Sequence, residues 1–225
     1  MRTITLDGAS GHLAEAKKPL GGVLLLPTIY GLNKFATDFA TMLAERGLTT
    51  FLWDPYAGEA LPKSFEEALS RAQQLRDGPS LDAMSIAVDF LMGELRLDKV
   101  ATIGFCLGGR YGLLLAARET RIEACTVVYP SITSPRGDNQ DEDAVIRAGE
   151  IPCPVQLVMP GHDNVTNPDT YQRLKSTLER RAAETVVQLY PAAHHGFLHA
   201  PGPENEAAAK HAPPLIGAFL ESHLA

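Results

Sequence analysis

Long apolar segments are missing from this sequence of 225 residues. No segment approaches the ~18 uninterrupted apolar residues that a membrane-spanning helix needs. Residues 1–18 also lack the apolar core of a signal peptide. We therefore expect neither a membrane protein nor a secreted one, and the sequence predicts a cytoplasmic location.

Cysteine is scarce. The three cysteines, Cys106, Cys125 and Cys153, are odd in number, widely spaced and without a Cys-x-x-Cys pair. This pattern favours neither a disulfide framework nor a zinc site, and we expect no metal and no cofactor. Cys125 and Cys153 lie in or beside apolar runs, so they are expected to be packing residues.

Positive charge is also in short supply. The chain has 20 basic and 27 acidic residues and a net charge of −7. This balance argues against binding to nucleic acid or to an anionic membrane surface. The expected partner is a small-molecule substrate, while length, charge and cysteine count leave both a monomer and a small homo-oligomer open.

The composition that remains is that of an ordinary globular protein, with 45% hydrophobic and 21% charged residues. The length suffices for one substantial core, and no repeat, linker or low-complexity tract interrupts it. The sequence predicts a single domain over residues 1–225.

Apolar runs that suit buried strands alternate with segments of helical period, which is typical of a mostly parallel sheet with helices on both faces. The expected central strands are residues 23–26, 49–53, 100–103, 124–129, 155–159 and 185–190. The expected helices carry apolar stripes at Phe35, Phe39, Met42 and Leu43, at Leu81, Met84, Val88, Leu91 and Leu95, and at Tyr171, Leu174 and Leu178. Residues 2–6 and 12–16, separated by a turn at 7–11, predict an antiparallel edge.

Two later segments carry their own expectations. Residues 204–224 suggest a helix, which Pro213 and Pro214 should kink or split because proline has no amide hydrogen. The acidic, glycine-containing residues 135–150 are the least core-like part of the chain. We expect a solvated surface connection there, with a lid as the alternative.

The central motif is Gly104-Phe105-Cys106-Leu107-Gly108, between the apolar run 100–103 and the helical segment 111–117. Its spacing matches the Gly-x-Ser-x-Gly nucleophile elbow, a strained strand-to-helix turn that exposes the nucleophile, with a thiol in place of the hydroxyl. The amino end of the following helix would favour the thiolate. Taken alone, the motif leaves a buried core cysteine beside an ordinary glycine turn as an open alternative.

An acid and a base candidate follow the next strands. Asp163 comes after the run 155–159 and His195 after the run 185–190, so both should lie at the carboxyl edge of the sheet. Alone, each has a simpler interpretation, a turn former for Asp163 and a solvated loop residue for His195. The order nucleophile, acid, base is nevertheless that of an α/β-hydrolase and favours acyl transfer.

These motifs together resemble the dienelactone hydrolase family, and the resemblance covers nearly the whole chain. The residues that carry it are Leu26-Pro27-Thr28-Ile29-Tyr30-Gly31-Leu32-Asn33, Gly104-Phe105-Cys106-Leu107-Gly108-Gly109, Gly161-His162-Asp163 and His195-Gly196-Phe197. The resemblance implies an α/β-hydrolase fold and a Cys-His-Asp triad of Cys106, His195 and Asp163. It also implies that His195, rather than His194, is the base.

The chemistry expected of these residues is ester or lactone hydrolysis. Asp163 would orient His195, His195 would take the thiol proton, and the Cys106 thiolate would attack the carbonyl to give a thioester acyl-enzyme. The backbone amides of Leu107 and Ile29 would hold the developing oxyanion, each contributing roughly 3 kcal/mol of transition-state stabilisation.

The sequence departs from the family at two positions. Thr28 stands where family members that act on dienelactone carry a glutamate that helps to form the thiolate, so His195 and the helix terminus would carry more of that task. His199 stands where those enzymes place an arginine that holds a substrate carboxylate, which weakens the expected recognition of an anionic lactone. Arg71 and Arg76 lie near a second anion contact of the family, but we expect both to be solvated surface residues.

The remaining candidates concern the substrate pocket. Tyr30, Trp53, Tyr129 and Phe197 could line an apolar pocket with Thr28 and His199, or could be ordinary core or rim residues. The predicted function is that of a carboxylic ester or lactone hydrolase. Two alternatives are a small-molecule binding protein without turnover on the same fold and a redox-sensing thiol protein.

Overall fold

The computed structural model describes residues 1–200 and 202–225. Eight strands form one sheet in the order β1-β2-β4-β3-β5-β6-β7-β8. The strands are β1 (Arg2–Leu6), β2 (Ala9–Ala14), β3 (Gly21–Leu26), β4 (Leu48–Trp53), β5 (Val100–Phe105), β6 (Ile122–Val128), β7 (Val155–His162) and β8 (Thr185–His194). All strands from β4 to β8 in this order pair in parallel, which confirms the predicted mostly parallel sheet.

The antiparallel edge is also confirmed, with a tighter turn than expected. β1 pairs antiparallel with β2, and Leu6 is paired with Ala9, so only Asp7 and Gly8 form the turn. Gly8 has a φ of 93°, a conformation that glycine adopts at little cost and that two-residue Asp-Gly hairpins require. The predicted five-residue turn was wrong because this dipeptide suffices to reverse the chain.

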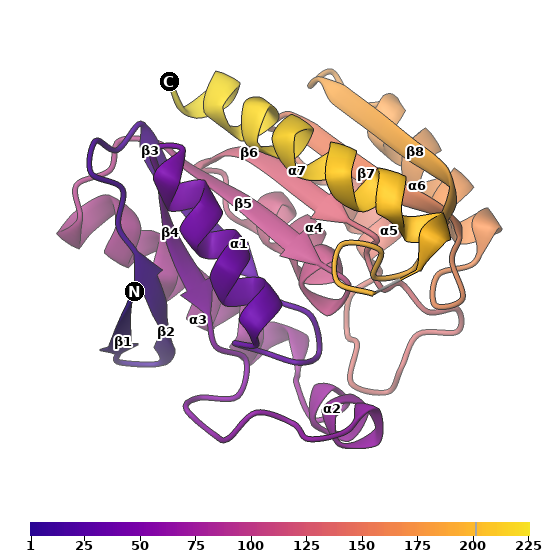
Figure 1. The fold of residues 1–225 in the computed structure, drawn as a ribbon, viewed down its shortest axis with the longest axis horizontal. Coiled ribbons are helices and arrows are strands. Elements are labelled where there is room, and N and C mark those ends of the chain that lie inside the picture. The colour runs from indigo at the N-terminus through magenta and orange to yellow at the C-terminus, as the bar shows by residue number, and fades with distance from the viewer. Residues whose placement is uncertain (201) are drawn as a thin grey trace.

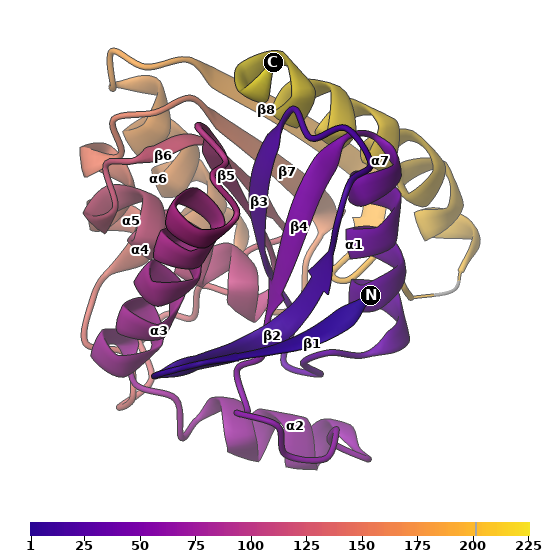
Figure 2. The same cartoon turned by 90° about the vertical axis from the view of Figure 1, so that its left-hand side faces the viewer.

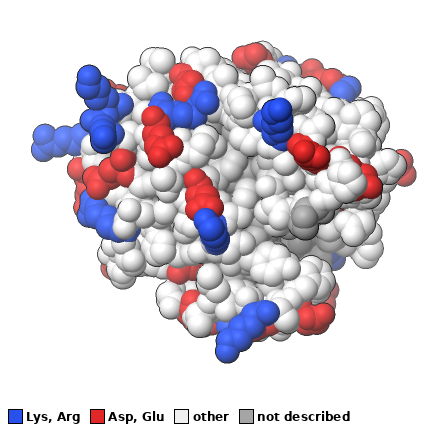
Figure 3. Space-filling model, in the orientation of Figure 1, with Lys and Arg blue, Asp and Glu red and all other residues white. Residues whose placement is uncertain are grey.

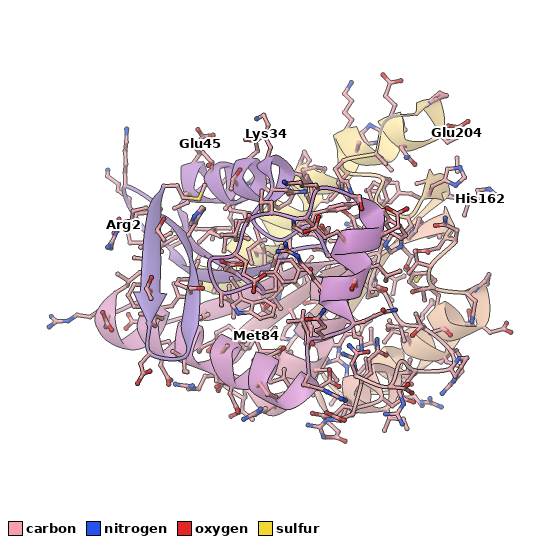
Figure 4. The ribbon with its side chains drawn as sticks, turned by 90° about the horizontal axis from the view of Figure 1, so that it is seen from below. Arg2, Lys34, Glu45, Met84, His162 and Glu204 are labelled. Atoms are coloured by element: carbon pink, nitrogen blue, oxygen red, sulfur yellow. The ribbon has the colours of Figure 1, made fainter. Side chains whose placement is uncertain are left out.

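Helices cover both faces of the sheet (Figures 1 and 2). They are α1 (Lys34–Glu45), α2 (Phe65–Ala72), α3 (Asp77–Asp89), α4 (Leu107–Arg118), α5 (Ala144–Arg147), α6 (Pro168–Glu179) and α7 (Pro203–Leu224), with a π-helical turn η1 (Phe90–Glu94) and a 3₁₀ turn η2 (Ala148–Glu150). α1 and α7 lie on one face, and α3, α4, α5 and α6 lie on the other. Viewed from below, Met84 of α3 lies across the molecule from Lys34 and Glu45 of α1 (Figure 4).

The core consists of two apolar clusters, one on each face of the sheet. Every residue of β3, β4 and β5 is buried. Strands covered on both faces need continuous apolar sequences rather than alternating ones, which explains why these runs were recognisable. The short helix α2 was not anticipated. It lies beyond the carboxyl ends of the parallel strands, below the sheet in Figures 1 and 2.

The last helix is not split at its prolines, because α7 continues through Pro213 and Pro214. A proline inside a helix costs about 3 kcal/mol, chiefly through a lost hydrogen bond and a clash with the preceding turn. The buried apolar residues of α7 are Ala208, Ala212, Ile216, Gly217, Phe219, Leu220 and Leu224. Burying each large apolar side chain contributes roughly 1.5–3 kcal/mol, so packing on the sheet offsets the cost of the prolines.

The expected surface connection at residues 135–150 was wrong for its second half. Ala144, Val145 and Ala148 are buried in the core cluster, on the short helix α5 and its continuation η2. The side chain of Asp143 caps this helix by accepting from the amides of Val145 and Ile146. Of the acidic residues in this segment, Asp143 is the cap, whereas Asp138 and Asp141 lie in its exposed first half.

The surface carries both signs of charge. On the face shown in Figure 3, basic and acidic side chains are interspersed among uncharged ones. Among residues 1–200 and 202–225, no helix is both long and apolar enough to cross a membrane.

Candidate active site

Cys106 occupies a strained turn between β5 and α4. Its backbone has a φ of 54° and a ψ of −113°, a region that residues with a side chain rarely adopt. The carbonyl of Cys106 accepts hydrogen bonds from the amides of Gly109, Arg110 and Ser131. Its side chain is partly exposed at the start of the helix. This is the conformation expected of a nucleophile elbow.

Two glycines make the turn possible. A Cβ atom on Gly104 would collide with the carbonyl of Gly108, and a Cβ atom on Gly108 would collide with the carbonyl of Leu26. These are backbone contacts that no side-chain rotation could relieve. Glycine is therefore required at both flanking positions by close approach of the chain rather than by flexibility.

Asp163 and His195 lie side by side because the strands before them are paired. His162, the last residue of β7, is paired in parallel with His194, the last residue of β8. Both strands extend further than their apolar runs suggested, so the next residue on each is brought to the same edge. The Nδ1 atom of His195 lies 2.9 Å from Oδ2 and 3.1 Å from Oδ1 of Asp163. His162, which directly precedes Asp163, is labelled in Figure 4 and shows where β7 ends.

The charges of this pair support each other. Burial alone would lower the pKa of His195, but the hydrogen bond to Asp163 and the neighbouring Cys106 outweigh burial and raise it to about 9. Burial opposes ionisation of Asp163 as well. Its hydrogen bonds from His195 and from the amides of Thr166 and Val165 nevertheless keep its pKa below the ordinary value.

The second ring nitrogen of His195 is available to the thiol. Within the residues that the structure describes, Nε2 is buried and has no hydrogen-bond partner. Cys106 is close enough to act on the pKa of His195. Because Asp163 occupies Nδ1, a proton moving from Cys106 would go to Nε2.

The backbone next to Cys106 can receive an oxyanion. Leu26 of β3 is paired with Gly104 of β5, and the amide of Gly108 donates to the carbonyl of Pro27 over 3.0 Å. The loop that contains Ile29 is thereby attached to the elbow. In the described part of the chain, neither the amide of Leu107 nor that of Ile29 has an acceptor, as an oxyanion hole requires.

The loop after β3 is held by its own polar groups. Thr28 is buried, and its Oγ1 accepts from the amide of Tyr30 over 3.3 Å. The hydroxyl of Tyr56 donates to the carbonyl of Ile29 over 2.6 Å. Thr28 therefore stabilises the turn through its hydroxyl. A glutamate at this position would place a negative charge there.

Aromatic rings surround His195. The ring of Tyr129 lies 5.2 Å from that of His195 and 5.2 Å from that of Phe197. The ring of His199 lies 4.9 Å from that of Phe35. His199 is an exposed residue whose ring is partly desolvated at this place, and this desolvation and the nearby His195 lower its pKa.

Not every pocket candidate belongs to this group. Trp53 is buried in the core cluster on the opposite face of the sheet, with its ring 5.9 Å from that of Tyr111. Tyr129 and Phe197 belong to the cluster against which Cys106 packs. The structure thus brings Tyr129, Phe197 and His199 to the candidate base and leaves Trp53 in the core.

The two arginines considered from the sequence differ. Arg76 is exposed and donates to the carbonyl of Asp138 over 2.8 Å. Arg71 is not simply solvated as expected. Its guanidinium contacts the carboxylates of Glu67 at 2.6 Å and Glu59 at 3.3 Å and lies over the ring of Tyr56. Two carboxylates therefore neutralise it.

Three supporting residues escaped sequence reasoning. Tyr171 donates its hydroxyl to Asp163 over 2.8 Å, although its place in an apolar helical stripe suggested only packing. Arg110 forms a buried double hydrogen bond with Asp77, at 2.6 and 2.8 Å. A cation within the apolar stretch that follows Cys106 was the available signal, since buried cations need a partner.

The third is Thr166, which joins the turn of Asp163 to the loop after β6. Its hydroxyl accepts from the amide of Ile132 and donates to the carbonyl of Pro130, over 2.8 and 2.7 Å. Its own amide donates to Asp163 over 2.9 Å. The neighbouring amide of Ser131 donates to Cys106, so Thr166 links the acid to the loop that supports the elbow.

No metal site accompanies these residues. Within residues 1–200 and 202–225, no group of three or more His, Cys, Asp or Glu side chains is placed to hold a metal ion. The chemistry that the arrangement offers is that of a nucleophile, a base and an orienting acid.

Comparison with known proteins adds to this geometry. A sequence model described as the dienelactone hydrolase family matches residues 9–224. A protein named carboxymethylenebutenolidase 2, from Cupriavidus pinatubonensis, is 31% identical over 204 residues, which cover 87% of this chain and 82% of that one. A carboxymethylenebutenolidase of Rhodococcus opacus is 27% identical over 179 residues, covering 78% of this chain and 69% of that one.

Solved structures agree on the fold. A dienelactone hydrolase-like promiscuous phosphotriesterase from metagenomic libraries superposes with a TM-score of 0.74 at 19% identity, covering 97% of each chain. An α/β-hydrolase from a Penicillium species superposes with a TM-score of 0.72 at 15% identity, covering 96% of this chain and 94% of that one. The fold is that of the α/β-hydrolases, as predicted.

Proposed function

Because the chain belongs to the dienelactone hydrolase family, we propose that it hydrolyses uncharged carboxylic esters or lactones through Cys106, His195 and Asp163. The observation that carries the proposal is the joint geometry of the three residues. A thiol on a strained elbow lies close to His195, whose Nδ1 atom is hydrogen-bonded to the carboxylate of Asp163. The relatives named as carboxymethylenebutenolidases support a lactone or ester as substrate.

The first half of the reaction forms a thioester. Nε2 of His195 holds the proton that leaves Cys106, and the thiolate sulfur forms a bond to the substrate carbonyl carbon. The electron pair of the carbonyl moves onto its oxygen, where the amides of Leu107 and Ile29 hold the charge. As the tetrahedral species collapses, the bond to the alcohol oxygen breaks, and His195 gives its proton to that oxygen.

The second half releases the acid. His195 takes a proton from water, and the resulting hydroxide oxygen attacks the thioester carbonyl. The carbon–sulfur bond breaks, and the sulfur of Cys106 recovers the proton from His195. Asp163 keeps its charge throughout and stabilises the imidazolium that forms in each half.

The charge state of the site favours an uncharged substrate. Thr28 cannot ionise, and the lowered pKa of His199 favours the neutral form of its ring. Arg71 is engaged with Glu59 and Glu67. A substrate carboxylate would lose its hydration without gaining a charged partner from these residues, which disfavours anionic lactones.

The test is an activity screen with Cys106→Ala as the inactive variant. Short p-nitrophenyl esters and simple lactones should be hydrolysed, and Cys106→Ala should lower kcat by at least about a thousandfold. Mass spectrometry after rapid quenching should find the acyl group on Cys106. Cys153→Ala is the matched control, because burial raises the pKa of the Cys153 thiol to about 11, and it should retain activity.

Two outcomes would contradict the proposal. Tight binding of esters without turnover would make the chain a binding protein. Oxidation of Cys106 by peroxide in a protein that never forms an acyl adduct would make it a redox sensor.

The charge preference has a separate test. The wild type should favour p-nitrophenyl butyrate over p-nitrophenyl hemisuccinate, which carries a carboxylate on its acyl chain. His199→Arg should move the ratio of the two kcat/KM values by about tenfold toward the anion, because guanidinium binds carboxylate in a bidentate manner. Preference of the wild type for the anion would overturn the assignment of substrate charge while leaving the hydrolase proposal intact.

A further inference from the structure

The carboxylate of Asp163 accepts hydrogen bonds from four groups. The amides of Val165 and Thr166 donate to Oδ1, over 2.7 and 2.9 Å. The hydroxyl of Tyr171 donates to Oδ2 over 2.8 Å, and Nδ1 of His195 lies 2.9 Å from the same oxygen. The oxygen that His195 approaches more closely is thus shared with a phenol.

Tyr171 is built to remain a donor at this place. It lies in the first turns of α6, and its ring is buried in the core cluster that also contains Leu174 and Leu178. Burial and the charge of Asp163 raise its pKa well above the ordinary value. The phenol therefore keeps its proton across the working pH range and points it at the carboxylate.

We propose that Tyr171 is a positioning residue that limits how strongly Asp163 holds the protonated form of His195. This inference rests on the proposed function, in which His195 moves protons between Cys106, the leaving group and water. A hydrogen bond to Oδ2 draws negative charge toward the phenol and leaves less for the imidazolium.

The balance has a consequence for turnover. An imidazolium held too strongly gives up its proton slowly to the departing alcohol, whereas one held too weakly does not form. Asp163 alone, buried and facing one imidazolium, would hold the proton firmly because charges interact strongly at low dielectric. The Tyr171 hydroxyl moderates that attraction while the amides of Val165 and Thr166 keep the carboxylate ionised.

Other charged or titratable groups also act on this pair. Cys106 and His199 both interact electrostatically with His195, and Tyr129 packs against its ring. Lys175 lines a cavity of about 190 Å³ beside Asp163 and Tyr171, and its ammonium is paired with Glu179 at 2.8 Å. Replacing Tyr171 by phenylalanine leaves all of these in place.

The decisive measurement is the pKa of His195 by NMR titration of its imidazole in a Cys106→Ala background, where no thiol titrates beside it. Tyr171→Phe should raise this pKa by about 0.5–1 unit, because the carboxylate oxygen then serves His195 alone. Tyr190→Phe, which removes a phenolic hydroxyl from β8, is the matched control and should leave it unchanged. An unchanged or lowered pKa in Tyr171→Phe would overturn the proposal.

A second variant excludes simple loosening of the fold. Tyr171→3-fluorotyrosine keeps the ring and the hydroxyl but makes the phenol a stronger donor, so the pKa of His195 should fall. If the pKa of His195 rises in one variant and falls in the other, the hydrogen bond itself is the cause. A shift of this pKa in the same direction in both variants would overturn the proposal. Since neither titration needs turnover, failure to hydrolyse any ester would count against the proposed function and not against this role of Tyr171.

Discussion

The imidazoles of His195 and its neighbour His194 differ in exposure and in their contacts. His194 ends β8 and is exposed, with its ring 5.6 Å from that of His162. His195 is the first residue beyond the strand and turns inward to Asp163. Two adjacent residues of one type thus lie in different surroundings, because the chain leaves the strand between them.

Substitution of each histidine tests which of the two is the base. His195→Asn should lower kcat/KM for an ester by about a thousandfold or more, because no other group in the site takes the thiol proton. His194→Asn should change it by less than about threefold, as is usual for an exposed side chain. Steady-state kinetics measures kcat/KM for both variants. A large loss in His194→Asn with a small loss in His195→Asn would assign the base to His194.

The same residue should make stability depend on pH. The folded-state pKa of His195 is raised from 6.5 to about 9, so its stabilising contribution is complete below pH 6.5 and is lost as the pH rises toward 9. The pKa of Asp163 is lowered from 3.8, so its contribution is present above that value and is lost in acid. The pair therefore contributes most between these two ordinary values.

Denaturant unfolding across pH tests this linkage. The difference in unfolding free energy between the wild type and His195→Asn should be largest near pH 6 and should shrink steadily toward pH 9. A difference that stays constant over this range would show that the histidine is not preferentially protonated in the folded state.

At the scale of elements, the site depends on the ends of β5, β7 and β8 and on the contacts between the loops that follow them. Apolar runs revealed the strands, since a parallel sheet buried on both faces needs them. Their last residues were less predictable. Pro160 and Pro191 suggest chain breaks, yet both lie within strands because pairing between β7 and β8 continues beyond them.

Side-chain hydrogen bonds between separate turns and helices were the other part that the sequence could not reveal. Cys106, Asp163 and His195 were recognisable as candidates from their order along the chain, and the structure brings Asp163 and His195 into contact. Tyr171 and Thr166 were not recognisable, since a tyrosine in an apolar stripe and a threonine in a turn each have a common local explanation. The role of Tyr171 arises where α6 packs against the turn of Asp163, and that of Thr166 arises where this turn meets the loop after β6. Pro213 and Pro214 show the converse, where tertiary packing of α7 overrides a strong local rule.

Thr166 offers a test at this scale. Thr166→Val keeps the shape of the side chain but leaves the amide of Ile132 and the carbonyl of Pro130 without their partner, at a cost of about 1–3 kcal/mol in unfolding free energy. It should also lower kcat more than it raises KM, because the acid and the elbow lose their connection. Thr50→Val, in β4, is the control: its buried hydroxyl donates to Leu48 over 2.9 Å, and its loss should spare kcat.

At the scale of the whole molecule, a buried ion pair connects separate parts of the chain near the site. It joins Arg110 and Asp77, whose side chains are 2% and 1% exposed. Arg110 also donates to the carbonyl of Glu142, and the amide of Glu142 donates to Asp77. This pair joins α4, α3 and the segment before α5. A chain region that looked like a surface loop is thus fastened to the helix that begins at the elbow.

Removing one partner should destabilise the entire fold. Arg110→Met leaves Asp77 buried without its cation and should lower the unfolding free energy by about 3–5 kcal/mol. The double variant Arg110→Met, Asp77→Leu removes both charges and should recover most of that loss. Urea unfolding of the three proteins measures the effect, and a double variant as unstable as the single one would show that the backbone contacts at Glu142 dominate.

The link through Thr166 also governs how the native protein opens. The amide of Ser131 donates a hydrogen bond to Cys106 at the elbow, and the amides of Ile132 and Thr166 donate to groups in the turn that contains Asp163. An amide exchanges its hydrogen only when such a bond opens, and bonds that share partners open together. These three amides should therefore show one common free energy of opening in native-state hydrogen exchange, so that the turn of Asp163 and the support of Cys106 are lost together.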